Sequence, residues 1–190
     1  GLIARRLGLA FDEDKRGFLA QLLDERVSGS GNSRAHYLDE IERMSLSHEE
    51  FRVLVRELTV CETYFFRNHD QFRALIEVAI PTRLMDNPQR RLALLSAACA
   101  SGEEAYSIAM MLRQAEAAPD AMIHAVDINA EMIERARAGR YSAWSLRETS
   151  PELRRRWFRL EARDFQLEAA ICQAVCFEQK NLVAQDAELW

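Results

Sequence analysis

The sequence predicts an α/β protein, with an all-helical N-terminal domain followed by a Rossmann-like domain built on a parallel sheet. Over residues 1–58, apolar residues recur every three or four positions among charged ones, as in amphipathic helices. From residue 91 onward, short apolar runs alternate with helical segments, and the runs at 92–95, 122–126 and 175–177 are the expected strands. This alternation implies parallel strands joined by right-handed crossovers.

Composition sets limits on the class of protein. The 190 residues are 48% hydrophobic and 29% charged, as in a soluble globular protein with one ordinary domain and a small one. No apolar run approaches the ~20 residues that span a bilayer, so direct membrane insertion is not expected. Arg5, Arg6 and Asp12 interrupt any signal-peptide core. A net charge of -5 argues against nucleic acid as a partner.

Cysteine and histidine usage predicts no metal site. The four cysteines form no C-x-x-C pair, and the four histidines lie far apart in the sequence. Free thiols in a reducing compartment are the default for such a chain, which makes a cytoplasmic location the expectation.

The N-terminal domain, 1–58, is expected to contain three helices. The first covers 17–27, and the glycine- and serine-rich stretch 28–33 is expected to be a flexible turn. Ser33 is a candidate cap for the second helix. Ser47 followed by Glu50 three residues later is a capping-box pattern that opens the third helix.

A connecting segment, 59–90, precedes the α/β domain of 91–190. Aromatic residues at 64–66 are most often core, and the polar residues Thr63 and Arg67 flank them. These two lie four positions apart, so they share one face if the stretch is helical. A helix is expected over 71–84.

The stretch 92–127 has the layout of a nucleoside-cofactor pocket. The first strand leads into a turn of small residues at 97–102, a helix opens on Glu103 and Glu104, and the second strand stops at Asp127. Ligands of open α/β sheets bind beyond the carboxyl ends of the strands. A carboxylate there accepts hydrogen bonds from both hydroxyls of a ribose.

The charge at this turn distinguishes between cofactors. A pyrophosphate-binding turn has several glycines and no anion at the helix N-terminus, whereas here one glycine precedes Glu103 and Glu104. Simple stabilisation of the helix by either glutamate is an equally weighted alternative. If one of them faces a ligand, the ammonium and sulfonium of S-adenosylmethionine suit the pocket, and NAD would be repelled.

Two further helices are expected after the second strand. Asn129 caps the first of them, which stops at Gly139 in a C′ position. Ser150 and Pro151 open the second. The arginine run 154–156 is interpreted as a solvated helix face, with an anionic partner surface as the open alternative.

The order of these motifs resembles the CheR-type chemotaxis receptor methyltransferases, which transfer a methyl group from S-adenosylmethionine to receptor glutamates. The resemblance covers essentially the whole chain. It is carried by LTVCETYFFR at 58–67, SAACASGEEAYSIA at 96–109, VDI at 126–128, AGRY at 138–141, and the stretch from Phe177 to Asn181 and Leu182.

The resemblance implies a class I S-adenosylmethionine-dependent methyltransferase domain, with S-adenosyl-L-homocysteine as the product of the cofactor. It implies a methyl-accepting receptor's cytoplasmic domain, or a related signalling protein, as partner. Arg67 corresponds to the family's proposed catalytic or orienting arginine. The family's cofactor contacts fall on Thr63, Arg67, Glu104, Asp127, Asn181 and Leu182.

The chain departs from the family pattern in three ways. Cys61 stands where archetypal members have asparagine, and Ala105 stands where members have proline. The family also continues with a fourth strand, and usually has a small β insertion that grips receptors; neither is expected here. A C-terminally truncated chain with an incomplete sheet is therefore expected, and its open apolar edge favours dimerisation or aggregation.

Three functions compete at this point. Methylation of receptor glutamates is favoured. A small-molecule methyltransferase of the same fold would not need the helical residues 1–58. A non-enzymatic signalling module would bind S-adenosylmethionine or S-adenosylhomocysteine without methyl transfer.

Overall fold

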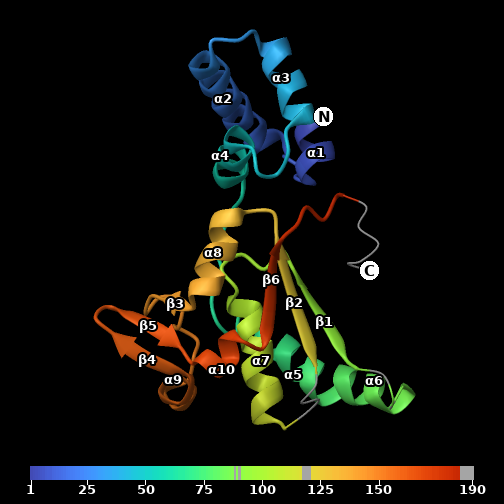
Figure 1. The fold of residues 1–190 in the computed structure, drawn as a ribbon, viewed down its shortest axis with the longest axis vertical. Helices are drawn as coiled ribbons and strands as arrows, with labels where there is room; N and C mark the ends of the chain where they lie inside the picture. Colours follow the sequence, from blue (N-terminus) through green and yellow to red (C-terminus); the bar gives the residue numbers. More distant parts are fainter. Residues whose placement is uncertain (88, 90, 117–120, 185–190) are drawn as a thin grey trace. The chain divides into compact units, whose positions relative to one another are not determined.

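The computed structural model describes residues 1–87, 89, 91–116 and 121–184, and it contains two compact units. Among the described residues, unit 1 consists of Gly1–Val60 together with 181–184, and unit 2 is Cys61–Lys180 (Figure 1). Within the described residues, none of the helices combines the length and the apolar character that crossing a membrane requires.

Unit 1 is helical over its N-terminal residues, as predicted. Its core joins Leu23, Tyr37, Ile41 and Leu54, one or two from each of three helices. A short first helix that the sequence analysis missed buries Ile3 and Leu7. The helices are α1 (Leu2–Leu7), α2 (Glu13–Ser30), α3 (Arg34–Arg43) and α4 (Glu49–Leu58).

The turn predicted at 28–33 is wrong over its first half, because α2 continues to Ser30. The hydroxyls of Ser28 and Ser30 donate to the backbone oxygens of Asp24 and Val27, so these residues close the last helical turn. The helix ends at Gly31, which adopts the left-handed conformation with φ of 70°. Ser33 caps α3, as predicted, by accepting the amide of His36.

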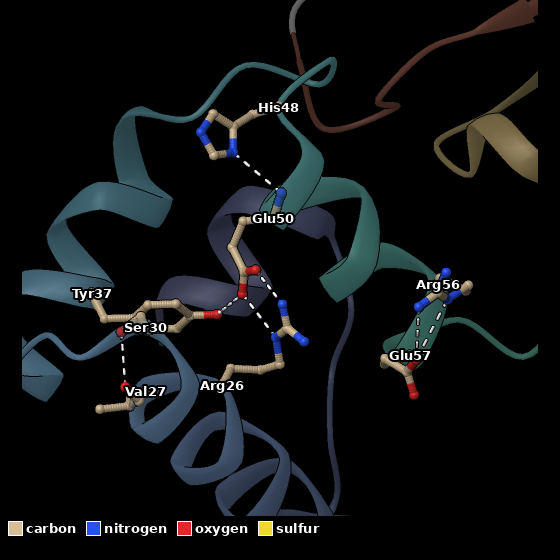
Figure 2. A network of polar contacts seen from close by, with 8 residues as sticks. All are labelled: Arg26, Val27, Ser30, Tyr37, His48, Glu50, Arg56 and Glu57. Carbon is tan, nitrogen blue, oxygen red and sulfur yellow. Dashed lines mark hydrogen bonds and ion pairs between the residues drawn. The ribbon is translucent and has the colours of Figure 1, made fainter.

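The capping box predicted for Ser47 and Glu50 is also wrong. The cap of α4 is His48, whose Nδ1 accepts the amide of Glu50 at 3.2 Å. The Glu50 carboxylate instead accepts hydrogen bonds from Arg26 and Tyr37, the latter at 2.5 Å (Figure 2). The Glu50 side chain, which the local sequence predicts as part of the helix cap, therefore forms a tertiary ion pair instead.

Unit 2 is built on a parallel sheet of order β1-β2-β6 (Figure 1). The three predicted strands are confirmed as β1 (Ala93–Ala97), β2 (Met122–Asp127) and β6 (Val175–Gln179). Ala97 lies beside Val126 and Asp127 lies beside Gln179, so the carboxyl ends of the strands meet at one edge. The predicted helices are confirmed as α7 (Glu103–Gln114), α8 (Ala130–Ala138) and α9 (Pro151–Trp157). A short α10 (Ala169–Cys172) precedes β6.

The helix predicted at 71–84 is present, but its middle is wound differently. It consists of α5 (His69–Ala74), the π-helical turn η1 (Leu75–Ala79) and α6 (Ile80–Asp86). The preceding stretch is irregular, so the condition for placing Thr63 and Arg67 on one helical face is not met. Phe65 and Phe66 are core residues, at 0% and 3% exposed.

A second, antiparallel sheet of order β3-β5-β4 corrects the expectation that no small β insertion is present. Its strands are β3 (Arg140–Tyr141), β4 (Phe158–Glu161) and β5 (Asp164–Leu167). They are only two to four residues long and rich in charged side chains, so they lack the apolar alternation by which strands are recognised. Phe158 and Leu167 pair across β4 and β5 and are buried in the main core.

The turn between β1 and α7 is tightly packed. Ala98, Ala100 and Gly102 all have positive φ, of 58°, 46° and 90°. A Cβ on Gly102 would lie 2.8 Å from the Phe177 ring and 2.9 Å from the Ala136 side chain. Only glycine satisfies both the backbone conformation and the contact distances at this position.

Gly102→Ala is expected to destabilise the protein by about 1–3 kcal/mol, because the new methyl group overpacks the core and strains the backbone. Urea unfolding followed by circular dichroism measures this loss. Gly17→Ala is the matched control, because a methyl group at this position meets no described atom within 4 Å. Alanine in place of glycine within a helix should raise the free energy of unfolding by about 0.5–1 kcal/mol. Equal effects from the two substitutions would contradict this packing argument.

Glu50→Gln is expected to lower the free energy of unfolding by about 1–2 kcal/mol, because Arg26 and Tyr37 lose their charged acceptor. Burial acts to raise the pKa of Glu50, but the hydrogen bonds from Arg26 and Tyr37 hold it below its ordinary value of 4.5. The stabilisation is therefore present above the unfolded pKa and is lost as pH falls through the folded pKa.

The difference in stability between wild type and Glu50→Gln should thus shrink between about pH 6 and pH 3. Glu49→Gln is the control, since its carboxylate is 80% exposed and lies 3.8 Å from Arg52. A pH-independent difference for Glu50→Gln would argue against the charge of Glu50 as the cause.

Candidate functional site

Asp127 ends β2 and organises the edge of the sheet. Its side chain is buried, and its Oδ2 accepts the backbone N–H of Ala100 at 2.8 Å. Its Oδ1 accepts the backbone N–H of Asn129, also at 2.8 Å. Each carboxylate oxygen has two lone pairs, so one on each oxygen stays available for a further donor such as a ribose hydroxyl.

The two glutamates that open α7 have different environments. Glu104 is exposed, and its Oε1 accepts the hydroxyl of Ser96, at the end of β1, at 2.6 Å. Glu103 is 2% exposed, and its Oε2 accepts the hydroxyl of Ser101 at 2.7 Å. Burial raises the pKa of Glu103, against the opposing hydrogen bonds from Ser101 and Ser145. Glu103 is therefore held within the protein, and Glu104 is the carboxylate that faces outward.

Hydrogen bonds hold the backbone of the LTVCETYFFR segment against α7. The amide of Phe66 donates to Ser107 Oγ at 3.0 Å, and that hydroxyl donates to the backbone oxygen of Glu103 at 2.6 Å. The amide of Phe65 donates to the backbone oxygen of Ser145 at 3.0 Å. The segment is thus fixed from two sides.

The same segment reaches the N-terminus of α8. Asn129 Nδ2 lies 3.7 Å from the sulfur of Cys61, the position where archetypal members have asparagine. Asn129 also caps α8 by accepting the amides of Glu131 and Met132, which confirms the predicted cap. The sequence predicted only the capping role of Asn129. In the structure its backbone N–H also donates to Asp127, and its side-chain amide contacts Cys61, so Asn129 connects the end of β2 to the LTVCETYFFR segment.

Arg67 is exposed and lies in a strained stretch of backbone. Phe66 and Asn68, on either side of it, have φ of 61° and 62°. The guanidinium donates to the backbone oxygen of Glu62 at 3.0 Å and lies 5.8 Å from the Tyr64 ring centre. Among the residues that the structure describes, no carboxylate forms an ion pair with Arg67. Backbone strain of this kind is concentrated at functional sites.

Unit 2 contains four of the six predicted cofactor contacts. Thr63 is half-buried on the same segment as Arg67, and Glu104 and Asp127 lie at the carboxyl ends of β1 and β2. Asn181 and Leu182 belong to unit 1, where Asn181 Nδ2 donates to the backbone oxygen of Arg6 at 2.6 Å.

Two hollows of unit 2 lie away from these residues. One, of about 380 Å³, is bounded by η1, α6 and β1 and is lined by apolar side chains such as Ile80 and Leu84. The other, of about 370 Å³, lies around Gln166 and Cys172. Neither is lined by any of the six predicted residues. The candidate site is therefore identified by the chemistry of its side chains and not by the size of a hollow.

The residues at this edge fit S-adenosylmethionine. The exposed carboxylate of Glu104 suits the cofactor's ammonium, and the buried carboxylate of Asp127 keeps lone pairs for its ribose hydroxyls. The small side chains of 97–102 permit close approach of the cofactor. Cys99 in this turn is 3% exposed, and burial raises the pKa of its thiol to about 12, so it is no nucleophile at neutral pH. In the described part of the chain, no three histidine, cysteine or acidic side chains gather as metal ligands.

Comparison with known proteins identifies the family. Residues 61–189 match the family described as "CheR methyltransferase, SAM binding domain". A chemotaxis protein methyltransferase of Vibrio cholerae is 31% identical over 94% of this chain and 63% of its own length. One of Campylobacter jejuni is 31% identical over 80% of this chain and 54% of its own length.

A probable biofilm formation methyltransferase, WspC, of Pseudomonas aeruginosa is 32% identical over 96% of this chain and 43% of its own length. The chain thus spans about half of the length of these curated relatives. It belongs to the family of CheR methyltransferase S-adenosylmethionine-binding domains.

Proposed function

We propose that this chain is the cofactor-binding part of a protein-glutamate methyltransferase that acts on a chemoreceptor-like signalling protein. The observation that carries the proposal is the carboxylate of Asp127, held at the end of β2 by two backbone amides. Beside it, the outward-facing Glu104 completes an acidic edge that suits a cationic nucleoside cofactor. Family membership and the names of the relatives support the same activity.

Each site residue has a proposed role. Glu104 binds the ammonium of the cofactor, and Asp127 binds the ribose. Thr63 and Arg67 contact the cofactor from the LTVCETYFFR segment. Asn181 and Leu182, which follow β6 after one intervening residue, are proposed to contact the edge and the face of the adenine.

The reaction requires little proton transfer by the protein. S-adenosylmethionine supplies a methyl group on a positively charged sulfur. A glutamate side chain of the substrate is already ionised at neutral pH, so the site needs no strong general base. The protein's contribution is to align the carboxylate and to remove water from it. The planar fork of Arg67 suits orientation of a carboxylate.

The proposed partner is the cytoplasmic domain of a methyl-accepting receptor or a related signalling protein. The relatives are named for chemotaxis and, in one case, for biofilm formation, so the pathway is left open. The antiparallel sheet β3-β5-β4 is a small β element of the kind that the resemblance associates with receptor binding, and it is proposed to contact the partner.

Arg67→Ala in the full-length protein is expected to abolish methyl transfer to a receptor domain, with a loss of at least about 100-fold in kcat/KM. Transfer of a labelled methyl group measures it. Arg73→Ala is the control, an exposed arginine on α5 paired with Asp70. Activity of Arg67→Ala within a few-fold of wild type would remove Arg67 from the mechanism.

Asp127→Asn is expected to weaken binding of S-adenosylmethionine and S-adenosylhomocysteine by about 10- to 100-fold, because one charged acceptor becomes a donor. Calorimetric titration with each compound measures the dissociation constants. Asp164→Asn, on β5 and 3.5 Å from Arg140, is the control. If the wild-type protein takes up neither compound, the proposed function fails. Binding without methyl transfer would instead select a non-enzymatic module.

A further inference from the structure

Arg147 is held between two aromatic rings on the loop that joins β3 to α9. Its guanidinium carbon lies 3.7 Å from the ring centre of Tyr64 and 4.3 Å from that of Trp144. Its Nη1 donates to the backbone oxygen of Trp144 at 2.9 Å. Trp144 itself is 69% exposed. A guanidinium fixed in this way presents its remaining N–H groups in a defined direction.

Among the described residues, Glu62 provides the carboxylate that forms an ion pair with this guanidinium. Arg147 Nη2 lies 3.7 Å from Glu62 Oε1, and the side chains are 20% and 69% exposed. Arg67 donates to the backbone oxygen of the same residue. Glu62 therefore contacts both arginines, one through its carboxylate and one through its backbone. Its ion pair with Arg147 is long, and its carboxylate is largely exposed to water, so the pair is weak.

The loop that carries Arg147 is rigidly joined to the segment that carries Arg67. The amide of Phe65 donates to Ser145 on this loop, and Leu146 is fully buried. Arg147 is thus positioned relative to Tyr64 and Arg67 by packing rather than by its own weak ion pair.

We propose that Arg147, stacked between Tyr64 and Trp144, binds an acidic side chain of the protein substrate, and that Glu62 occupies this position until the substrate displaces it. This inference rests on the proposed function, because it assigns the substrate side of the same site. The proposed partner is a protein surface that carries a glutamate or aspartate side chain.

Three observations favour this assignment over a purely structural role. A pre-oriented guanidinium loses little entropy on binding a carboxylate. An exposed tryptophan beside an arginine is the composition of binding hot spots. The occupant, Glu62, carries the same functional group as the proposed substrate and is largely exposed to water.

The test measures binding of a purified receptor signalling domain to the full-length protein, in the presence of S-adenosylhomocysteine, together with KM for that domain in methyl transfer. Arg147→Ala and Trp144→Ala should weaken binding and raise KM by about tenfold. Glu62→Gln should tighten binding and lower KM by about two- to fivefold, because the internal competitor loses its charge. Such a gain cannot arise from misfolding.

The control is Arg73→Ala, which removes an exposed arginine of α5 that pairs with Asp70 at 3.2 Å. It should leave binding unchanged. The dissociation constant for S-adenosylhomocysteine should stay within about twofold in all variants.

Three results would overturn the inference: no binding of the domain by wild type, unchanged binding in both Arg147→Ala and Glu62→Gln, or a parallel loss of cofactor affinity. Binding that responds to these variants without any methyl transfer would support the inference while rejecting the proposed function. This result would distinguish a failure of the proposed methyl transfer from a failure of substrate binding by Arg147.

Discussion

The edge of the parallel sheet depends on the carboxylate of Asp127. It accepts the amide of Ala100, from the turn after β1, and the amide of Asn129, from the start of α8. Backbone donors in such turns have no partner within a helix or strand, and a buried donor left unpaired is costly. One side chain therefore fixes both loops at the site. The same carboxylate is the proposed ribose acceptor, so structure and binding depend on one group.

Acidic residues in this protein divide by burial into two kinds. Glu103 is buried and Glu50 is partly buried, and arginine, tyrosine or serine side chains bind their oxygens. Glu62 and Glu104 face outward and keep binding capacity for other groups. The neighbouring residues Glu103 and Glu104 thus differ in role: Glu103 is packed in the core, and Glu104 is the proposed cofactor ligand. The backbone oxygen of Glu103 adds to this, because through Ser107 it holds the segment that carries Arg67.

Regular elements with strong local signals were predictable. The strands of the parallel sheet are mostly apolar, and the caps at Ser33, Asn129 and Ser150 bind the amides that their positions predict. Elements without such signals were missed or misplaced. The short strands of β3-β5-β4 obtain their stability from Phe158 and Leu167 in the shared core. Glu50 was assigned to a cap because its partner Arg26 is 24 positions away in the chain.

For the site, sequence by itself determined the acidic turn, the carboxylate after the second strand and the resemblance that points to Thr63 and Arg67. Without the resemblance, which points to Glu104, the sequence could not decide between Glu103 and Glu104, because adjacent residues of a helix point about 100° apart and only packing shows which one is buried. It also gave no sign that Arg147 stacks on Tyr64, a contact between residues 83 positions apart. Local chemistry is written in neighbouring residues, whereas burial and long-range pairing exist only once the chain has folded.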